Sequence, residues 1–268
     1  MRYSIFDPTG NITALVEDNV DVELQPMVAA NIMKAHPKVE QVGFVTDSTT
    51  VGADTTLRMA GGEFCGNATM SAAALYALKH GCDDHMELHV RASGATDPVA
   101  VVLDKFDSDS FDARVLMPRA KRLVPVALSY RGLSDVVSVV FFEGISHVII
   151  PENSVLYVLR HDASSAEEAV RMWCHELSAD GLGLMFLSGN GRDRTLIPLV
   201  FVPGSDTVYW ENSCASGSAA VGMFVGATTN APCDLLLHEP GGTLRVSCNP
   251  LSAETWLFGH VTRVSTVQ

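Results

Sequence analysis

Two cysteine-containing segments repeat about half a chain length apart, and this repeat constrains the fold more than any other feature. Residues 64–73 (FCGNATMSAA) align with residues 213–222 (SCASGSAAVG), so Cys214 lies 149 residues after Cys65 in a chain of 268 residues. A fixed internal offset of this kind indicates a duplicated architecture. We therefore expect two similar halves, each carrying one of these cysteines.

Each cysteine precedes a stretch of small and apolar residues that is long enough for a helix. The first stretch runs from Ala68 to Lys79 and ends at Gly81, and the second runs from Ser218 to about Thr228. A helix that is apolar on nearly every side belongs in the interior of a fold. The sequence thus predicts one buried central helix in each half, with a cysteine at its N-terminus.

The flanks of the two cysteine segments also correspond. Amphipathic helices are expected over residues 22–36 and 166–179, the second opened by a capping box of Ser164 and Glu167. The sequence Pro240-Gly241-Gly242 is typical of a tight turn between strands. Strands are predicted for the β-branched runs at residues 99–103, 136–142, 147–150, 196–202 and 243–247.

These patterns predict an α/β (α+β) protein with two pseudo-symmetric halves, each a mostly antiparallel sheet wrapped around a central helix. The boundary is expected between Pro118 and Pro125, giving an N-terminal half of residues 1–118 and a C-terminal half of residues 119–255. If the halves face each other, the two helix N-termini point into one shared cleft.

Composition and charge argue against several classes of protein. The chain is 47% hydrophobic, with a net charge of −13 and an isoelectric point near 5.0, which disfavours nucleic acid and anionic membrane as partners. The sequence also lacks an apolar run long enough for a membrane span or a signal peptide, so a cytoplasmic location is expected. Its six cysteines form no CxxC pair, which argues against a disulfide scaffold or structural zinc.

The paired cysteines suggest proton transfer at carbon. A cysteine at the start of a helix lies near unpaired backbone N–H groups and the positive end of the helix dipole, which favour the thiolate. Moving an α-hydrogen from one face of an amino acid to the other requires two acid/base groups on opposite sides of one carbon. The N–H groups of Gly66, Asn67, Ala215 and Ser216 are candidate donors to the substrate carboxylate, where charge develops.

The residues on either side of the two cysteines resemble known active-site motifs. The segments Glu63-Phe64-Cys65-Gly66-Asn67-Ala68-Thr69-Met70 and Trp210-Glu211-Asn212-Ser213-Cys214-Ala215-Ser216-Gly217-Ser218 resemble those of the diaminopimelate epimerase superfamily. They look most similar to the histidine racemases of opine-metallophore (staphylopine-type) pathways. The resemblance extends along the chain through residues 8–11, 40–44, 240–242 and 261–264.

This resemblance implies a diaminopimelate epimerase-like fold in which the final strand, residues 256–268, returns to the first half. It implies catalysis by a thiol and a thiolate, with no cofactor such as pyridoxal phosphate and no metal, and it is consistent with a homodimer. By position, Asn11, Gln41, Asn67 and Glu211 match residues that hold the amino-acid head group in the superfamily.

Two departures from diaminopimelate epimerases bear on the substrate. Glu211 lies only three residues before Cys214, where those enzymes have a longer acidic and glycine-rich run, and Ile145-Ser146-His147 replaces their Asn-Pro-His stretch. Both differences argue against diaminopimelate. The resemblance therefore favours histidine as the substrate and a place in amino-acid metabolism that yields a D-amino acid.

Other functions remain open at this point. The chain could act on another amino acid, including diaminopimelate, or could bind an amino acid without catalysis. A thiol hydrolase needs a histidine beside its cysteine, and no spacing ties His147, His175 or His238 to either cysteine. The other four cysteines, at positions 82, 174, 233 and 248, are interpreted as ordinary thiols.

Overall fold

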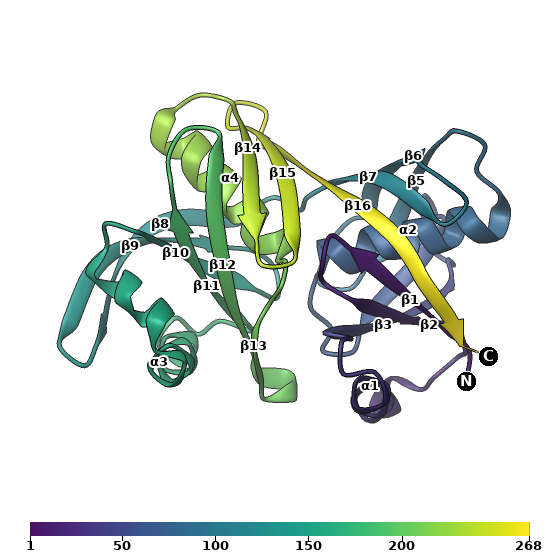
Figure 1. Cartoon of the computed structure of the whole chain (residues 1–268), viewed down its shortest axis with the longest axis horizontal. Helices are drawn as coiled ribbons and strands as arrows, with labels where there is room; N and C mark the ends of the chain where they lie inside the picture. Colours follow the sequence, from purple (N-terminus) through teal and green to yellow (C-terminus); the bar gives the residue numbers. More distant parts are fainter. Residues whose placement is uncertain (268) are drawn as a thin grey trace. The chain divides into compact units, whose positions relative to one another are not determined.

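The computed structural model describes residues 1–267 and divides the chain into two compact units (Figure 1). The first unit contains Met1–Met117 together with Trp256 and the residues after it, and the second contains Pro118–Thr255. No helix in the described part of the chain is long and apolar enough to cross a membrane.

The first unit is a sheet closed into a ring. Its strands follow the order β1-β2-β3-β4-β5-β6-β7-β16, and β16 also pairs with β1. The β2–β3 and β4–β5 pairs are parallel and the remaining ladders are antiparallel. The strands are β1 (Tyr3–Pro8), β2 (Thr13–Val16), β3 (Gln41–Asp47), β4 (Thr55–Met59), β5 (His85–Ala92), β6 (Val99–Lys105), β7 (Ser110–Leu116) and β16 (Glu254–Val267).

Two α-helices cover opposite faces of this sheet. Helix α1 (Gln25–Ala35), which follows a short 3-10 turn η1 (Val22–Leu24), packs Ala29 and Ile32 on one face of β1, β2 and β3. Helix α2 (Gly66–His80) contacts β1, β2 and β4 to β7 and buries most of its residues. Its small side chains allow strands to approach it on nearly every side. The helix ends at Gly81, whose φ of 85° suits a residue without a Cβ.

The second unit is a sheet with the strand order β15-β14-β12-β11-β10-β9-β8, and β13 pairs with β12. The β10–β11 and β12–β14 pairs are parallel. The strands are β8 (Arg122–Tyr130), β9 (Leu133–Phe141), β10 (Ser146–Pro151), β11 (Leu182–Ser188), β12 (Asp193–Val202), β13 (Thr207–Trp210), β14 (Cys233–Glu239) and β15 (Gly242–Asn249). The tight turn predicted at residues 240–242 joins β14 to β15.

Helices again lie on both faces of the second sheet. Helix α3 (Ala163–Glu176) buries Trp173 against β8 to β12, and helix α4 (Ala215–Thr229) packs on β14, β15, β10 and β11. Two short 3-10 segments, η2 (Val155–His161) and η3 (Pro203–Ser205), complete the unit.

Alternating residues of β11 show the division between these faces. Leu184 and Phe186 belong to the core beneath α3, whereas Gly183 and Met185 lie on the side of α4. Each residue of a strand points to the face opposite that of its neighbour. The face occupied by α4 is therefore the one that carries the second cysteine.

One predicted helix start is wrong. The sequence predicted a capping box at Ser164, but the N-cap of α3 is Asp162, whose carboxylate accepts the N–H of Ser165 at 3.1 Å and the Ser165 hydroxyl at 2.8 Å. A carboxylate at an N-cap accepts first-turn N–H groups and interacts favourably with the helix dipole. The helix consequently begins three residues earlier than predicted and ends at Glu176.

Candidate active site

Cys65 is the N-cap residue of α2. Its backbone is extended, with φ −132° and ψ 114°, and its side chain turns back toward the helix so that the sulfur accepts the N–H of Ala68 at 3.4 Å. This N–H is one of the donors at the helix start that have no partner within the helix. The sulfur of Cys65, a partly exposed residue, is thus placed where a backbone donor and the helix dipole stabilise negative charge.

A chain of amide side chains leads away from the Cys65 sulfur. The thiol donates to Oε1 of Gln41 at 3.1 Å, and Nε2 of Gln41 donates to Asn11 and, at 2.9 Å, to Thr13. Nδ2 of Asn11 in turn donates to the carboxylate of Glu40 at 3.1 Å. Because the Glu40 carboxylate can only accept, it fixes the order of donors along the chain. The Gln41 carbonyl is therefore the group that faces the thiol.

The first turn of α2 supplies the rest of the first half site. Gly66 and Asn67 are both buried, with Asn67 1% exposed, directly after Cys65. The loop before the cysteine is held by Ser93, whose hydroxyl donates to the Glu63 carbonyl at 2.7 Å and accepts the N–H of Met59 at 2.9 Å. The adjacent Gly94, at φ 69°, comes so close to Phe64 that a Cβ there would lie 2.3 Å from the Phe64 nitrogen.

Cys214 is the N-cap residue of α4 and has nearly the same backbone conformation as Cys65, with φ −123° and ψ 99°. It is only 5% exposed. Its pKa lies well above the ordinary thiol value, because burial penalises the thiolate and the carboxylates of Glu211 and Glu239 add negative charge, although the N–H of Gly217 acts in the opposite direction. In the free protein the Cys214 sulfur is consequently protonated.

His147 and Ser216 lie beside the second cysteine. Nε2 of His147 lies 2.9 Å from the Ser216 hydroxyl, which in turn lies 3.8 Å from the Cys214 sulfur. His147 is fully buried on β10, and desolvation lowers its pKa to about 3. A neutral imidazole therefore contacts Cys214 through a hydroxyl and adds no charge to the site.

A buried carboxyl group lies beneath the start of α4. Glu239, the last residue of β14, accepts the backbone N–H of Cys214 at 2.7 Å and the hydroxyl of Ser218. Burial is the main reason that its pKa is raised to about 8, although both of these hydrogen bonds favour the charged form.

The residues predicted from sequence fall into two groups, one in each unit. The first unit joins Cys65, Gln41 and Asn11 by hydrogen bonds and places Gly66 and Asn67 in the same helix turn. The second unit places Glu211, Ala215 and Ser216 around Cys214.

Sequence reasoning missed three residues that the fold brings to these groups. Thr13 supports Gln41, His147 reaches Ser216, and Glu239 bonds to Cys214. The sequence indicates His147 only as the end of the Ile145-Ser146-His147 stretch and as a possible hydrolase partner, with no spacing that ties it to either cysteine. A histidine within an apolar strand and a glutamate directly before the Pro-Gly-Gly turn were the available signals.

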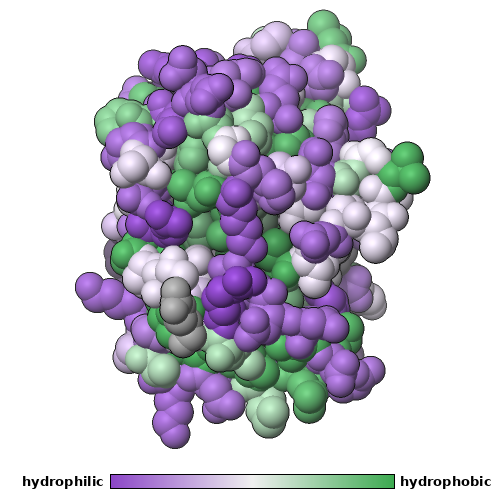
Figure 2. All heavy atoms as spheres, turned by 90° about the vertical axis from the view of Figure 1, so that its right-hand side faces the viewer, coloured by the Kyte–Doolittle hydropathy of each residue, from purple (hydrophilic) through white to green (hydrophobic). Residues whose placement is uncertain are grey.

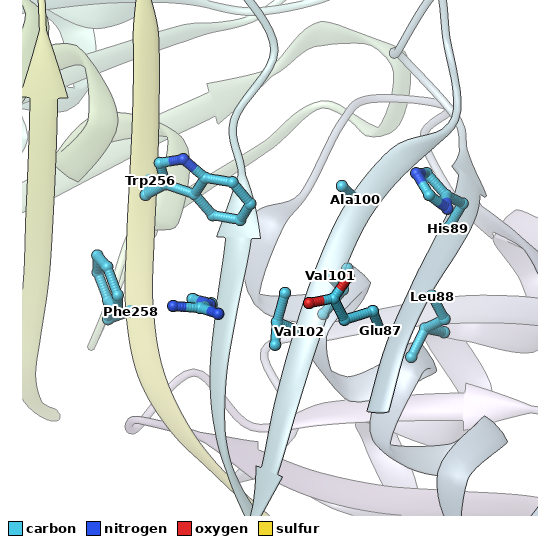
Figure 3. A pocket seen from close by; sticks show the side chains of 9 residues that line it. Glu87, Leu88, His89, Ala100, Val101, Val102, Trp256 and Phe258 are labelled. Carbon is cyan, nitrogen blue, oxygen red and sulfur yellow. The ribbon is translucent and has the colours of Figure 1, made fainter. Parts of the chain in front are cut away.

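A separate groove lies on the outer face of the first sheet (Figure 3). It encloses about 460 Å³ over β5, β6, β7 and β16, and its lining includes Glu87, His89 and Trp256. The guanidinium of Arg114 lies 5.9 Å from the centre of the Trp256 ring. Figure 2 looks onto the side of the chain at the right of Figure 1 and shows mainly hydrophilic side chains with scattered apolar ones. None of the predicted site residues lines this groove.

Comparisons with known proteins agree along the whole chain. The family model for the histidine racemase CntK N-terminal domain matches residues 1–265. The histidine racemase of Staphylococcus aureus (strain Mu50) is 33% identical over 274 residues, covering 99% of this chain and 96% of the relative. A histidine racemase of Fusobacterium nucleatum subsp. nucleatum is 30% identical, covering 82% of this chain and 79% of the relative.

Solved structures with low sequence identity share the fold. A predicted epimerase from Pseudomonas aeruginosa aligns with a TM-score of 0.71 at 15% identity, covering 100% of this chain and 98% of the other. A hydroxyproline epimerase from Agrobacterium vitis aligns with a TM-score of 0.69 at 11% identity, covering 100% and 90%. The chain thus has the mixed α/β fold of these racemases and epimerases and, on its sequence, belongs to the histidine racemase family of isomerases.

Proposed function

We propose that the protein interconverts L- and D-histidine by two-base proton transfer, with Cys65 and Cys214 as the two acid/base groups. The observation that carries the proposal is that both sulfurs occupy the same place, the N-cap of a buried small-residue helix, in two units of similar strand order. Two such sites, acting from opposite faces of one α-carbon, supply the symmetry that a racemase needs.

The chemistry begins with one thiolate and one thiol. The thiolate removes the α-proton, and the electron pair of the broken C–H bond moves into the substrate carboxylate. The opposite thiol then gives its proton to the other face of the carbon and becomes the thiolate. Each turnover exchanges the roles of the two cysteines, so the reverse reaction uses the same groups.

The helix N-termini stabilise the charge that develops on the substrate. We propose that the N–H groups of Gly66 and Asn67 in one unit, and of Ala215 and Ser216 in the other, bind the substrate carboxylate as the electron pair moves into it. Donors fixed at that place stabilise the transition state more than the ground state. The small side chains of α2 and α4 leave room for a carboxylate to approach the backbone.

The head group of the amino acid is assigned to the polar residues beside the cysteines. We propose that Asn11, Gln41, Asn67 and Glu211 orient the ammonium and carboxylate groups of the substrate. Histidine as the side chain is supported by the match to the histidine racemase family and by relatives of that name.

The test is α-proton exchange in D₂O, followed by ¹H NMR and chiral chromatography with reduced protein and no added cofactor. We expect L-histidine to gain deuterium at the α-carbon and D-histidine to appear at a matching rate. If another amino acid exchanges its α-proton and histidine does not, histidine is overturned as the substrate and the two-base chemistry still stands. Binding of histidine without exchange would overturn the catalytic proposal and identify a binding protein.

A further inference from the structure

Glu239 joins two parts of the helix that begins with Cys214. The residue is 8% exposed at the end of β14, and one carboxylate oxygen accepts the Cys214 N–H at 2.7 Å while the other accepts the Ser218 hydroxyl. One side chain thus contacts both the N-cap residue and the first turn of α4. The adjacent turn adds a second tie, because the N–H of Gly241 donates to the Asn212 carbonyl at 2.8 Å.

The first unit holds its cysteine loop at the corresponding place without a charge. Strand β5 follows α2 as β14 follows α4, and the residue after β5 is Ser93. Its hydroxyl bridges the Glu63 carbonyl and the Met59 N–H. A neutral side chain is therefore sufficient to fix such a loop. Because burying a carboxyl group carries a large desolvation cost, the presence of Glu239 beside Cys214 points to a use for this carboxyl group beyond fixing the loop.

The groups around Glu239 show what that charge acts on. Glu211 faces it from the loop before α4, Cys214 and Ser218 face it from α4 itself, and the neutral His147 approaches the other side of Cys214 from β10 through Ser216. Both carboxylates raise the Cys214 pKa. The pKa of Glu239 is raised to about 8, below the pKa of Cys214. Glu239 is therefore already ionised at any pH where the Cys214 thiol begins to lose its proton.

We propose that Glu239 is a positioning residue for Cys214: it holds the Cys214 backbone in the N-cap conformation through its contacts with the Cys214 N–H and the Ser218 hydroxyl and, once ionised, opposes the loss of the thiol proton. The importance of that thiol as the proton donor rests on the proposed function. When the S–H bond breaks and the proton passes to the substrate carbon, the thiolate that remains is buried beside Glu239, where burial disfavours its charge. It is consequently a strong base that readily takes a proton from the next substrate molecule.

The first test removes the charge of Glu239 and keeps its hydrogen bonds. In Glu239→Gln the amide oxygen can still accept the Cys214 N–H, and the amide N–H₂ can donate to Ser218. The thiolate of Cys214 is followed by its ultraviolet absorbance against pH, with the matching variant that also carries Cys214→Ser subtracted. We expect the midpoint of the Cys214 titration to fall by about one pH unit or more.

Glu176→Gln is the matched control, since it removes the same charge from an exposed position on α3 of the same unit. Its Cys214 midpoint should equal that of the unaltered chain. A Glu239→Gln protein that folds and titrates like the unaltered chain would overturn the proposal.

A second measurement needs no change at Glu239. In the unaltered chain the backbone amide of Cys214 donates to the Glu239 carboxylate, so its ¹H and ¹⁵N chemical shifts should titrate with a midpoint near the Glu239 pKa of about 8. Ser218→Ala removes a hydrogen bond that favours the charged form and should move this midpoint upward. The Cys65 amide serves as the internal reference, and a Cys214 amide that does not titrate in this range would contradict the inference.

Neither measurement uses a substrate, so the two proposals fail separately. Failure of histidine to exchange its α-proton, with the Cys214 titrations as expected, would overturn the proposed function alone. Racemisation of histidine together with an unmoved Cys214 midpoint would overturn the role of Glu239 alone.

Discussion

The two cysteine sites share a backbone and differ in what surrounds the sulfur. Cys65 is partly exposed and faces the neutral amide of Gln41, whereas Cys214 is buried and faces the carboxylates of Glu211 and Glu239. The same helix N-terminus thus occurs in two electrostatic environments. Each unit supplies one thiol, and the side chains around the two sulfurs make that of Cys214 harder to ionise.

The difference extends into one parallel strand pair of each unit. Thr13 pairs with Gln41 across β2 and β3, and His147 pairs with Gly183 across β10 and β11. In the first unit the larger polar side chain of the pair, Gln41, extends from β3. In the second, His147 extends from β10, and it fits only because Gly183 has no side chain: a Cβ there would lie 2.4 Å from the imidazole.

The largest expected effect comes from deleting either thiol. Cys65→Ser and Cys214→Ser should each reduce histidine racemisation by about 10³-fold or more, because a hydroxyl is too weak an acid to replace a thiol in the proton relay. Chiral chromatography of the product measures the loss. Cys82→Ser, at a thiol outside both groups, should retain turnover. A Cys65 or Cys214 variant that also retains turnover would remove that cysteine from the mechanism.

The second prediction separates the two thiols by reactivity. Near pH 8, iodoacetamide should alkylate Cys65 at least about tenfold faster than Cys214, since Cys65 is more exposed and the pKa of Cys214 is raised. Mass spectrometry of the digested protein measures both rates, and alkylation in denaturant provides the reference at which the two should converge. Faster labelling of Cys214 in the folded protein would reverse the assigned asymmetry.

The third prediction concerns packing three residues after each cysteine. Ala68 already carries a Cβ in α2, but the equivalent Gly217 in α4 has none, and a Cβ there would lie 2.2 Å from the sulfur of Met185. Gly217→Ala should lower the free energy of unfolding by about 2 kcal/mol, because the cost of overpacking exceeds the gain in helix propensity.

Urea unfolding measures this change in stability. Gly204→Ala is the control, because nothing lies within 4 Å of a Cβ at that position, and it should leave the stability almost unchanged. A Gly217→Ala protein as stable as the unaltered chain would show that the second helix tolerates the packing found in the first.

The smallest effect is a pH dependence that only the second unit should show. The pKa of His147 is lowered to about 3 in the folded protein, so on acidification the unfolded chain binds a proton near pH 6.5 that the native protein does not yet bind. Stability present above pH 6.5 is consequently lost as the pH falls toward 3. By pH 5.5 this loss is about 1 kcal/mol.

His147→Asn removes that titration, so its stability relative to the unaltered chain should improve between pH 7.5 and 5.5. Unfolding curves at several pH values measure the trend. His89→Asn, at an exposed histidine of β5, should leave the trend unchanged. A parallel pH dependence for the His147→Asn and unaltered proteins would place the acid sensitivity elsewhere in the chain.

Much of the local structure could be predicted from the sequence. The small-residue stretches predicted two buried helices, which the structure has as α2 and α4, and the Pro-Gly-Gly turn joins two strands as expected. These features depend on composition and spacing along the chain. The start of α3 was predicted wrongly, because Asp162 and Ser164 are both good N-caps and nothing local decides between them.

The repeated helix starts, with the two cysteines and the first-turn donors, follow from the amino-acid sequence alone. Helix propensity and the N-cap are local properties, encoded within a few residues. The groups that surround each sulfur come together through tertiary contacts: Gln41 lies 24 residues from Cys65, Glu239 lies 25 residues from Cys214, and His147 lies 69 residues from Ser216. Those distances are closed by strand pairing, and burial then sets the ionisation of the groups that it brings together.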